Sequence, residues 1–177
     1  MEKITKITYF DFDGTSVKTQ MPDSGKIIWE NVTGNVWPHI GWWSKPESLD
    51  IEVFEHPVNP LVKEANDIHN GCDETLTVML TGRRKHLATL VEDLLDKYEY
   101  KFDRHQYNYG GSTEQNKIDQ MNNALEEFKN VKTITFFDDR LEHLPIFKDY
   151  LTSLVDNGRL DTFNLYHVDG QGEINVY

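Results

Sequence analysis

The feature that most constrains this chain is the alternation of short apolar segments with longer amphipathic ones. Strands are predicted over residues 4–11, 75–80, 103–109, 131–137 and 162–168, and helices over residues 60–70, 84–98, 113–128 and 141–155. The segments TLTVML and TITFF are apolar or β-branched throughout, as strands covered on both faces are. Strands joined by helices of this length form right-handed crossovers and a mostly parallel sheet. The sequence therefore predicts an α/β fold, a Rossmann-like three-layer sandwich with a mostly parallel central sheet.

Capping residues set the expected helix boundaries. Asn59 is expected to cap the helix that begins at Pro60, and Gly71 to end that helix. Ser112 is expected to cap a later helix, with Gln115 in the position that completes a capping box.

Residues 16–56 interrupt the alternation. They contain all four tryptophans of the protein, Trp29, Trp37, Trp42 and Trp43, together with three glycines and three prolines. A loop of this length inside a compact domain is usually functional or a small insertion. Because 177 residues is about the length of one domain, we expect a single domain over residues 1–177, with a cap-like insertion at residues 16–56 after the first strand.

Composition and charge exclude several classes of function. The net charge of −12 disfavours broad binding to duplex nucleic acid, which needs a basic face. A single cysteine, Cys72, excludes an intrachain disulfide framework and fits a reducing compartment. No apolar run reaches transmembrane length, so no membrane association is expected. The start, MEKITKITYF, has no signal-peptide apolar region, which predicts a cytoplasmic protein.

Chemically active side chains follow the predicted strands at the points where each strand ends. Ligands of open α/β sheets bind beyond the carboxyl ends of the strands. The candidates there are Asp11, Asp13, Gly14 and Thr15 after the first strand, Thr81, Gly82, Arg83 and Arg84 after the second, Lys117 in the next helix, and Asp138, Asp139 and Arg140 after the fourth. Burying two aspartates at a strand end is costly unless a metal, a cation or hydrogen bonds compensate.

The motifs DFDGT, LTGR, Lys117 and FFDDR, in this order, resemble the haloacid dehalogenase (HAD) superfamily of phosphotransferases over roughly residues 4–168. GWWSKP, LTGRR, GGSTEQNK and FFDDRLEHLPIF look most like the HAD domain of Swiss Army Knife RNA repair proteins. GR and DDR are similar to the phosphatase domain of polynucleotide kinase-phosphatase. The resemblance implies a HAD-like fold and a Mg²⁺-dependent hydrolase, a phosphatase of phosphoric monoesters.

The residue types fit that chemistry. Carboxylate oxygens of Asp11 and Asp138 suit Mg²⁺, which keeps several waters and needs few protein ligands; Asp139 is a further candidate ligand. The resemblance adds the backbone carbonyl of Asp13. Asp11 is expected to be the nucleophile that forms an aspartyl-phosphate. Asp13 is expected to protonate the leaving alkoxide and then to activate the water that hydrolyses the intermediate.

Thr81 and backbone amides near Gly82 are expected to bind the transferring oxygens, and Lys117 to neutralise their charge. In the polynucleotide phosphatases an aspartate lies four residues before the motif lysine. Here that position is Thr113, which puts carboxylate orientation of the lysine in doubt.

The expected substrate is a phosphate monoester, with a nucleotide or a single-stranded nucleic-acid end as the candidate partner. Arg83 and Arg84 are candidate phosphate contacts. Trp42 and Trp43 are candidate surfaces for stacking on unpaired bases. The alternative is that the tryptophans are packing residues and that the arginines are surface charges.

Three other functions remain open at this point. A small-metabolite phosphatase would use the same motifs, and a catalytically silent binding module would use the same fold. A signalling receiver domain also places aspartates, a threonine and a lysine around Mg²⁺. A receiver, however, has its acid pair on the first strand and no long insertion after it. Asp13-Gly14 alone would also fit an ordinary turn.

Overall fold

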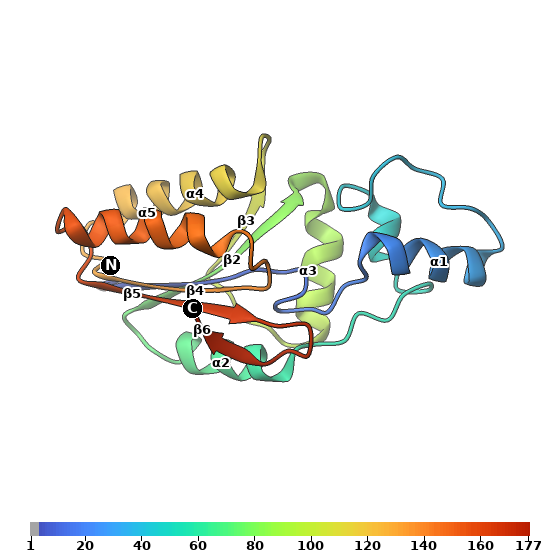
Figure 1. Cartoon of the computed structure of the whole chain (residues 1–177). Helices are drawn as coiled ribbons and strands as arrows, with labels where there is room; N and C mark the ends of the chain where they lie inside the picture. Colours follow the sequence, from blue (N-terminus) through green and yellow to red (C-terminus); the bar gives the residue numbers. More distant parts are fainter. Residues whose placement is uncertain (1–3) are drawn as a thin grey trace.

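A sheet of six strands lies at the centre of the molecule. The computed structural model describes residues 4–177, so the first three residues of the expected domain range 1–177 lie outside the described part. The strands are β1 (Lys6–Phe10), β2 (Thr75–Arg84), β3 (Arg104–Asn108), β4 (Thr133–Asp138), β5 (Thr162–Val168) and β6 (Ile174–Val176), in the spatial order β3-β2-β1-β4-β5-β6. All neighbouring pairs are parallel except β5–β6 (Figure 1).

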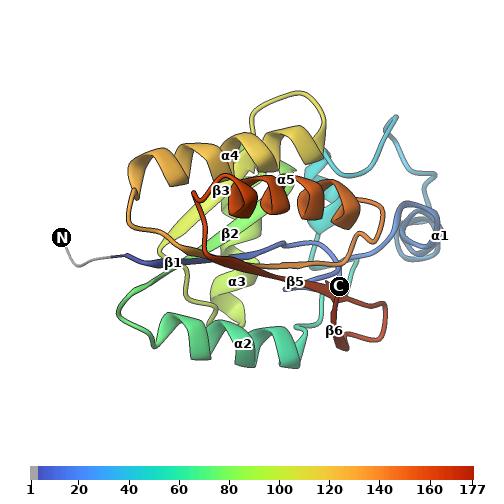
Figure 2. The same cartoon turned by 60° about the vertical axis from the view of Figure 1, so that its left-hand side comes forward.

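Helices cover both faces of the sheet, which confirms the predicted three-layer α/β architecture. On one face lie α4 (Thr113–Glu127) and α5 (Leu144–Asp156); on the other lie α2 (Pro60–Asn70) and α3 (Ala88–Lys97) (Figures 1 and 2). The alternation of side chains along β1 serves both layers. Ile7 and Tyr9 are buried in the cluster that includes Met121 of α4 and Phe147 of α5, and Phe10 is buried on the other side.

The strand register brings three motif-bearing segments to one edge. Phe10 is aligned with Met79 of β2 and with Phe137 of β4. The Asp11 amide then donates to the Phe137 carbonyl at 3.0 Å. Asp11, Leu80 and Asp138, which follow these aligned positions, therefore lie at the same level, near the carboxyl ends of the parallel strands.

Several predicted boundaries are wrong. β2 runs to Arg84 instead of ending at Leu80, because its pairing with β3 resumes at Arg84 after a register shift. The helix expected from residue 84 begins with a 3₁₀ turn at Lys85–Leu87 and becomes α-helical at Ala88. The last strand is not β5: the antiparallel β6 follows it, and three residues are too few to give a periodic signal.

The expected caps form only in part. The Ser112 hydroxyl accepts the Gln115 amide at 3.2 Å, as predicted. The Gln115 side chain, however, donates to Asp119 at 2.8 Å instead of returning to the cap. Asn59 precedes α2, but its side chain makes no capping hydrogen bond.

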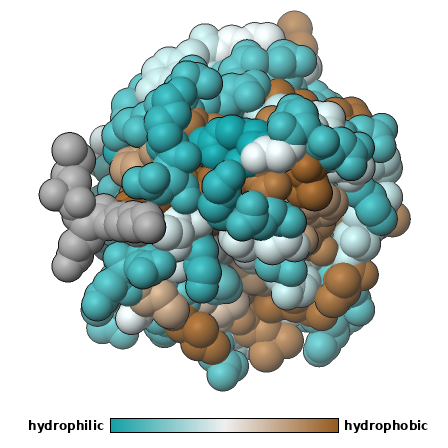
Figure 3. All heavy atoms as spheres, turned by 90° about the vertical axis from the view of Figure 1, so that its left-hand side faces the viewer, coloured by the Kyte–Doolittle hydropathy of each residue, from teal (hydrophilic) through white to brown (hydrophobic). Residues whose placement is uncertain are grey.

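Residues 16–56 contain α1 (Pro22–Thr33) and a 3₁₀ helix, η1 (Pro46–Leu49), and they extend beyond the carboxyl ends of the parallel strands (Figure 1). Their centre is aromatic: Trp37, Trp42 and Phe54 are buried together. Figure 3 shows the opposite end of the molecule, where hydrophilic and hydrophobic side chains are interspersed. Within residues 4–177, none of the helices is long and apolar enough to cross a membrane.

Candidate active site

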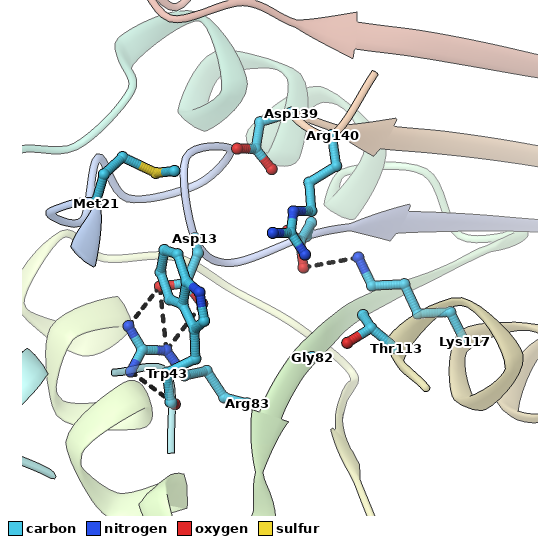
Figure 4. Close-up of a pocket in the computed structure, with 10 residues that line it drawn as sticks. Asp13, Met21, Trp43, Gly82, Arg83, Thr113, Lys117, Asp139 and Arg140 are labelled. Atoms are coloured by element: carbon cyan, nitrogen blue, oxygen red, sulfur yellow. Dashed lines mark hydrogen bonds and ion pairs between the residues drawn. The ribbon is translucent and has the colours of Figure 1, made fainter. Parts of the chain in front are cut away.

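A cavity of about 100 Å³ opens at the carboxyl edge of the sheet, under the insertion. Its walls come from the segment after β1, from β2, α4 and the segment after β4, and from two residues of the insertion. They are Asp11, Asp13, Met21, Trp43, Gly82, Arg83, Thr113, Lys117, Asp139 and Arg140 (Figure 4). The structure thus brings motif residues far apart in the sequence to one place.

Three carboxylates and one ammonium group form the floor of the site. Asp11, Asp138 and Asp139 each offer an oxygen within 4.8 Å of the others. Lys117, only 1% exposed, reaches two of them: its Nζ lies 2.9 Å from Asp11 Oδ1 and 2.6 Å from Asp138 Oδ2. Asp138 therefore supplies the carboxylate that the sequence lacks at Thr113, and Lys117 is held between two acids.

Burial sets the electrostatics of this floor. It raises the pKa of both Asp11 and Asp139, the neighbouring acids also raise these pKa values, and Lys117 lowers them without offsetting the rise. Burial lowers the pKa of Lys117, but Asp11 and Asp138 outweigh it, so that the pKa of Lys117 is raised on balance. The lysine is thus a charged ammonium. Its single positive charge does not offset the burial of three carboxylates.

A divalent cation fits this deficit. Asp139 Oδ1 is buried without a hydrogen-bond partner among residues 4–177. Asp11 Oδ1, by contrast, is ion-paired with Lys117 Nζ at 2.9 Å. Asp138 is already engaged: Lys117 and the Arg140 amide each donate to one of its oxygens, at 2.6 and 2.9 Å. Free carboxylate oxygens are ligands for Mg²⁺. Asp139 is therefore better placed as a ligand than Asp138.

Gly14 lets Asp139 approach. Its φ is +70°, and a Cβ built on it would lie 2.2 Å from Asp139 Oδ2. Only glycine combines this backbone conformation with that close contact.

Asp13 is held by Arg83. The guanidinium Nε lies 3.1 and 2.9 Å from the two Asp13 oxygens, and Nη2 lies 2.7 Å from Oδ1. The Thr19 hydroxyl also donates to Oδ1, at 2.7 Å. Arg83 was expected to bind substrate. It lines the cavity, but it is 1% exposed and most of its donors serve the protein, so the geometry favours a positioning role.

Two other residues of the LTGRR motif differ in position. Gly82 lines the cavity, packed closely against Thr113. Thr81 is fully buried and is not a cavity residue; its hydroxyl accepts the Arg83 amide at 3.1 Å, which shapes the strand end. Arg84 also lies outside the cavity, and donates to Asn108 Oδ1 at 3.2 Å.

The two candidate stacking residues have opposite environments. Trp42 is 2% exposed, and its indole N–H donates to the Gln20 carbonyl at 2.9 Å. The prediction that Trp42 stacks on a base is therefore wrong, because no face of the ring is free. Trp43 is half-buried and lines the cavity, with Arg83 Cζ 5.1 Å from its ring centroid.

Sequence reasoning missed three residues of the site and gave a fourth, Arg140, a place at a strand end but no role. Arg140 lines the cavity, and its ionic partner Glu142 is 3.4 Å away. Met21 and Thr113 also line the cavity, and Ser48 bonds Arg83 from the insertion. Only Arg140 had a signal, its place after Asp138-Asp139.

Residues 24–174 match HAD domain family 1 in Swiss Army Knife RNA repair proteins. The chain belongs to this family. The matched range contains Thr81, Lys117 and Asp138-Asp139, and leaves Asp11 and Asp13 just outside. The HAD identification made from the four motifs is confirmed.

Two further proteins are similar to this HAD domain. An uncharacterized protein of Saccharomyces cerevisiae, YMR265C, is 24% identical over 175 residues, which cover 85% of this chain and 38% of that protein. A chain in the structure of the Pnkp1/Rnl/Hen1 RNA repair complex superposes with a TM-score of 0.60 at 15% identity, over 96% of this chain and 44% of that one. The HAD domain thus spans less than half the length of either protein. The similarity to the chain of the RNA repair complex is a similarity of fold alone.

Proposed function

We propose that this HAD domain is a Mg²⁺-dependent phosphomonoesterase that works through an aspartyl-phosphate on Asp11. The observation that carries the proposal is the buried cluster of three aspartates, in which Lys117 pairs with Asp11 and Asp138 while Asp139 Oδ1 has no hydrogen-bond partner among residues 4–177. Three buried carboxylates beside a single ammonium group are costly unless they also meet a further cation or a reacting phosphorus. A metal-assisted phosphoryl transfer supplies both.

Asp11, Asp139 and the backbone carbonyl of Asp13 would hold the ion, with Asp138 as an additional oxygen source. When bound, Mg²⁺ would screen the negative charge of the phosphate from the attacking carboxylate. Lys117 would neutralise charge on the transferring oxygens.

The residues of this chain would perform two steps. Asp11 attacks phosphorus, so that a carboxylate oxygen–phosphorus bond forms and the bond to the leaving oxygen breaks, while Asp13 gives its proton to the leaving alkoxide. Water then attacks phosphorus, Asp13 takes a proton from it, and Asp11 leaves as a carboxylate with release of inorganic phosphate.

The proposed substrate is the phosphorylated end of a single-stranded polynucleotide, or a nucleotide. The family's place in RNA repair proteins supports this class. The Trp43 ring and the Arg140 guanidinium in the cavity walls offer a stacking surface and an anion contact for the part of the substrate beyond the phosphate. The net charge of −12 disfavours extended contact with a duplex.

The test is release of inorganic phosphate from a panel containing 3′- and 5′-phosphorylated oligonucleotides, mononucleotides, sugar phosphates and p-nitrophenyl phosphate. Activity is expected with Mg²⁺ and none with EDTA, and Asp11→Asn is the control for contaminating phosphatases. Activity that survives EDTA would refute the metal dependence. No release from any substrate would refute the enzyme and favour the silent binding module. Far faster release from sugar phosphates would refute only the nucleic-acid assignment.

A further inference from the structure

Arg83 connects the carboxylate of Asp13 to the insertion. Its Nε and Nη2 face Asp13, at 2.7 to 3.1 Å, whereas Nη1 faces the other way. Nη1 donates to the Trp43 carbonyl at 3.0 Å and to Ser48 Oγ at 2.6 Å. One planar group thus spans residues that lie 70 and 35 positions away along the chain.

The Ser48 hydroxyl oxygen is available to accept this hydrogen bond. It is fully buried in η1, and its hydroxyl hydrogen goes to the Lys45 carbonyl at 2.7 Å. Its oxygen lone pairs are therefore left to accept from Arg83.

The Arg83 guanidinium has little freedom to adopt another orientation. Its donors point in fixed directions within one plane, and the side chain is 1% exposed. A buried donor that loses its acceptor is not rescued by water and costs the full desolvation penalty. The orientation that satisfies Ser48 and Trp43 is therefore the one that also aligns Nε and Nη2 with Asp13.

We propose that Ser48, acting through Arg83, is a positioning residue for Asp13, so that proton transfer at the active site depends on the insertion being seated on β2. The inference rests on the proposed function, in which Asp13 gives a proton to the leaving alkoxide and takes one from water. It adds a structural dependence: when η1 moves away from β2, Arg83 is released and Asp13 loses its alignment. Trp43 extends this dependence to the substrate, because its carbonyl holds Arg83 while its ring lines the cavity.

The first experiment compares Ser48→Ala with Ser44→Ala, an exposed serine of the same segment. Substrates are an alkyl phosphate, whose alkoxide needs a proton to leave, and p-nitrophenyl phosphate, whose phenolate needs it less. For Ser48→Ala we expect kcat with the alkyl phosphate to fall roughly ten- to hundredfold, and kcat with p-nitrophenyl phosphate only a few-fold. Ser44→Ala should match the wild type. Arg83→Lys should repeat the Ser48→Ala pattern, since an ammonium cannot serve both sides.

The second experiment follows the Arg83 Nε proton by NMR, independently of activity. Ser48→Ala should speed its exchange with solvent by about tenfold relative to wild type, because the guanidinium is less well held. An unchanged exchange rate, or equal kinetic losses with both substrates, would overturn the coupling while leaving the phosphatase intact. A wild type that hydrolyses nothing in the panel would overturn the proposed function, and the catalytic role of Ser48 with it.

Discussion

Gly14→Ala is the most informative single substitution, because two separate costs can be calculated for it. The first is backbone strain: φ at Gly14 is +70°, a conformation that costs an L-residue about 1–2 kcal/mol. The second is collision. The new Cβ would lie 2.2 Å from Asp139 Oδ2, 2.6 Å from its Cγ and 3.1 Å from its Cβ. The Asp139 carboxylate must therefore move by more than 1 Å before Oδ2 reaches the 3.4 Å of ordinary contact.

The matched control is Gly158→Ala. Gly158 has φ +74°, and a Cβ there meets no atom within 4 Å, so this variant carries the strain without the collision. In urea unfolding, Gly158→Ala should lose about 1–2 kcal/mol of unfolding free energy. Gly14→Ala should lose a further 1–3 kcal/mol or so from overpacking.

Phosphate release separates the two variants. A displacement of about 1 Å at a catalytic group costs on the order of 100-fold in rate. We therefore expect kcat/KM of Gly14→Ala to fall roughly 100-fold, with a higher Mg²⁺ concentration needed for half-maximal activity, and Gly158→Ala to keep wild-type activity. A Gly14→Ala enzyme with wild-type kcat/KM and Mg²⁺ dependence would refute the assignment of Asp139 as a ligand.

Four other outcomes follow from the geometry. Asp11→Asn should abolish turnover while leaving urea unfolding nearly unchanged, and near wild-type hydrolysis would contradict the aspartyl-phosphate. Lys117→Met leaves two buried acids without their cation, so it should lower the unfolding free energy by about 3–5 kcal/mol; a loss below about 1 kcal/mol would mean that Lys117 is not what neutralises them. Trp43→Ala should raise KM for an oligonucleotide roughly tenfold and spare p-nitrophenyl phosphate. Trp42→Ala should instead destabilise the fold by about 3–5 kcal/mol, and equal kinetic losses for both substrates in Trp43→Ala would make Trp43 a packing residue as well.

The sheet and its catalytic edge were predictable because their signals are local. Apolar runs such as TLTVML predict a strand covered on both faces. A parallel sheet brings the carboxyl ends of such strands together wherever they lie in the sequence. The alignment of Phe10 with Met79 and Phe137 made that expectation concrete. The predicted end of β2 failed for a non-local reason, since the strand is prolonged by pairing with Asn108.

The partners of Arg83 were not predictable in this way. Its contacts with Asp13 and Ser48 join segments that no periodicity relates, and they depend on where the insertion settles. An arginine beside a strand end is equally compatible with a phosphate contact and with an internal ion pair. Burial decides between these roles, and burial of a long charged side chain has no signature in the sequence.

Trp42 and Trp43 show the same limit at adjacent positions. The two residues are of the same type and have nearly the same sequence neighbours, yet the Trp42 ring is enclosed and the Trp43 ring lines the cavity. The structural cause is Gly25 in α1, where a Cβ would lie 2.2 Å from Trp42 Cη2, so the ring rests directly on the helix backbone. A glycine inside a helix costs about 1 kcal/mol relative to alanine. Gly25 is therefore the one trace of this contact in the sequence: a destabilising residue in α1 marks the place where a large side chain from another segment must fit, although it does not say which.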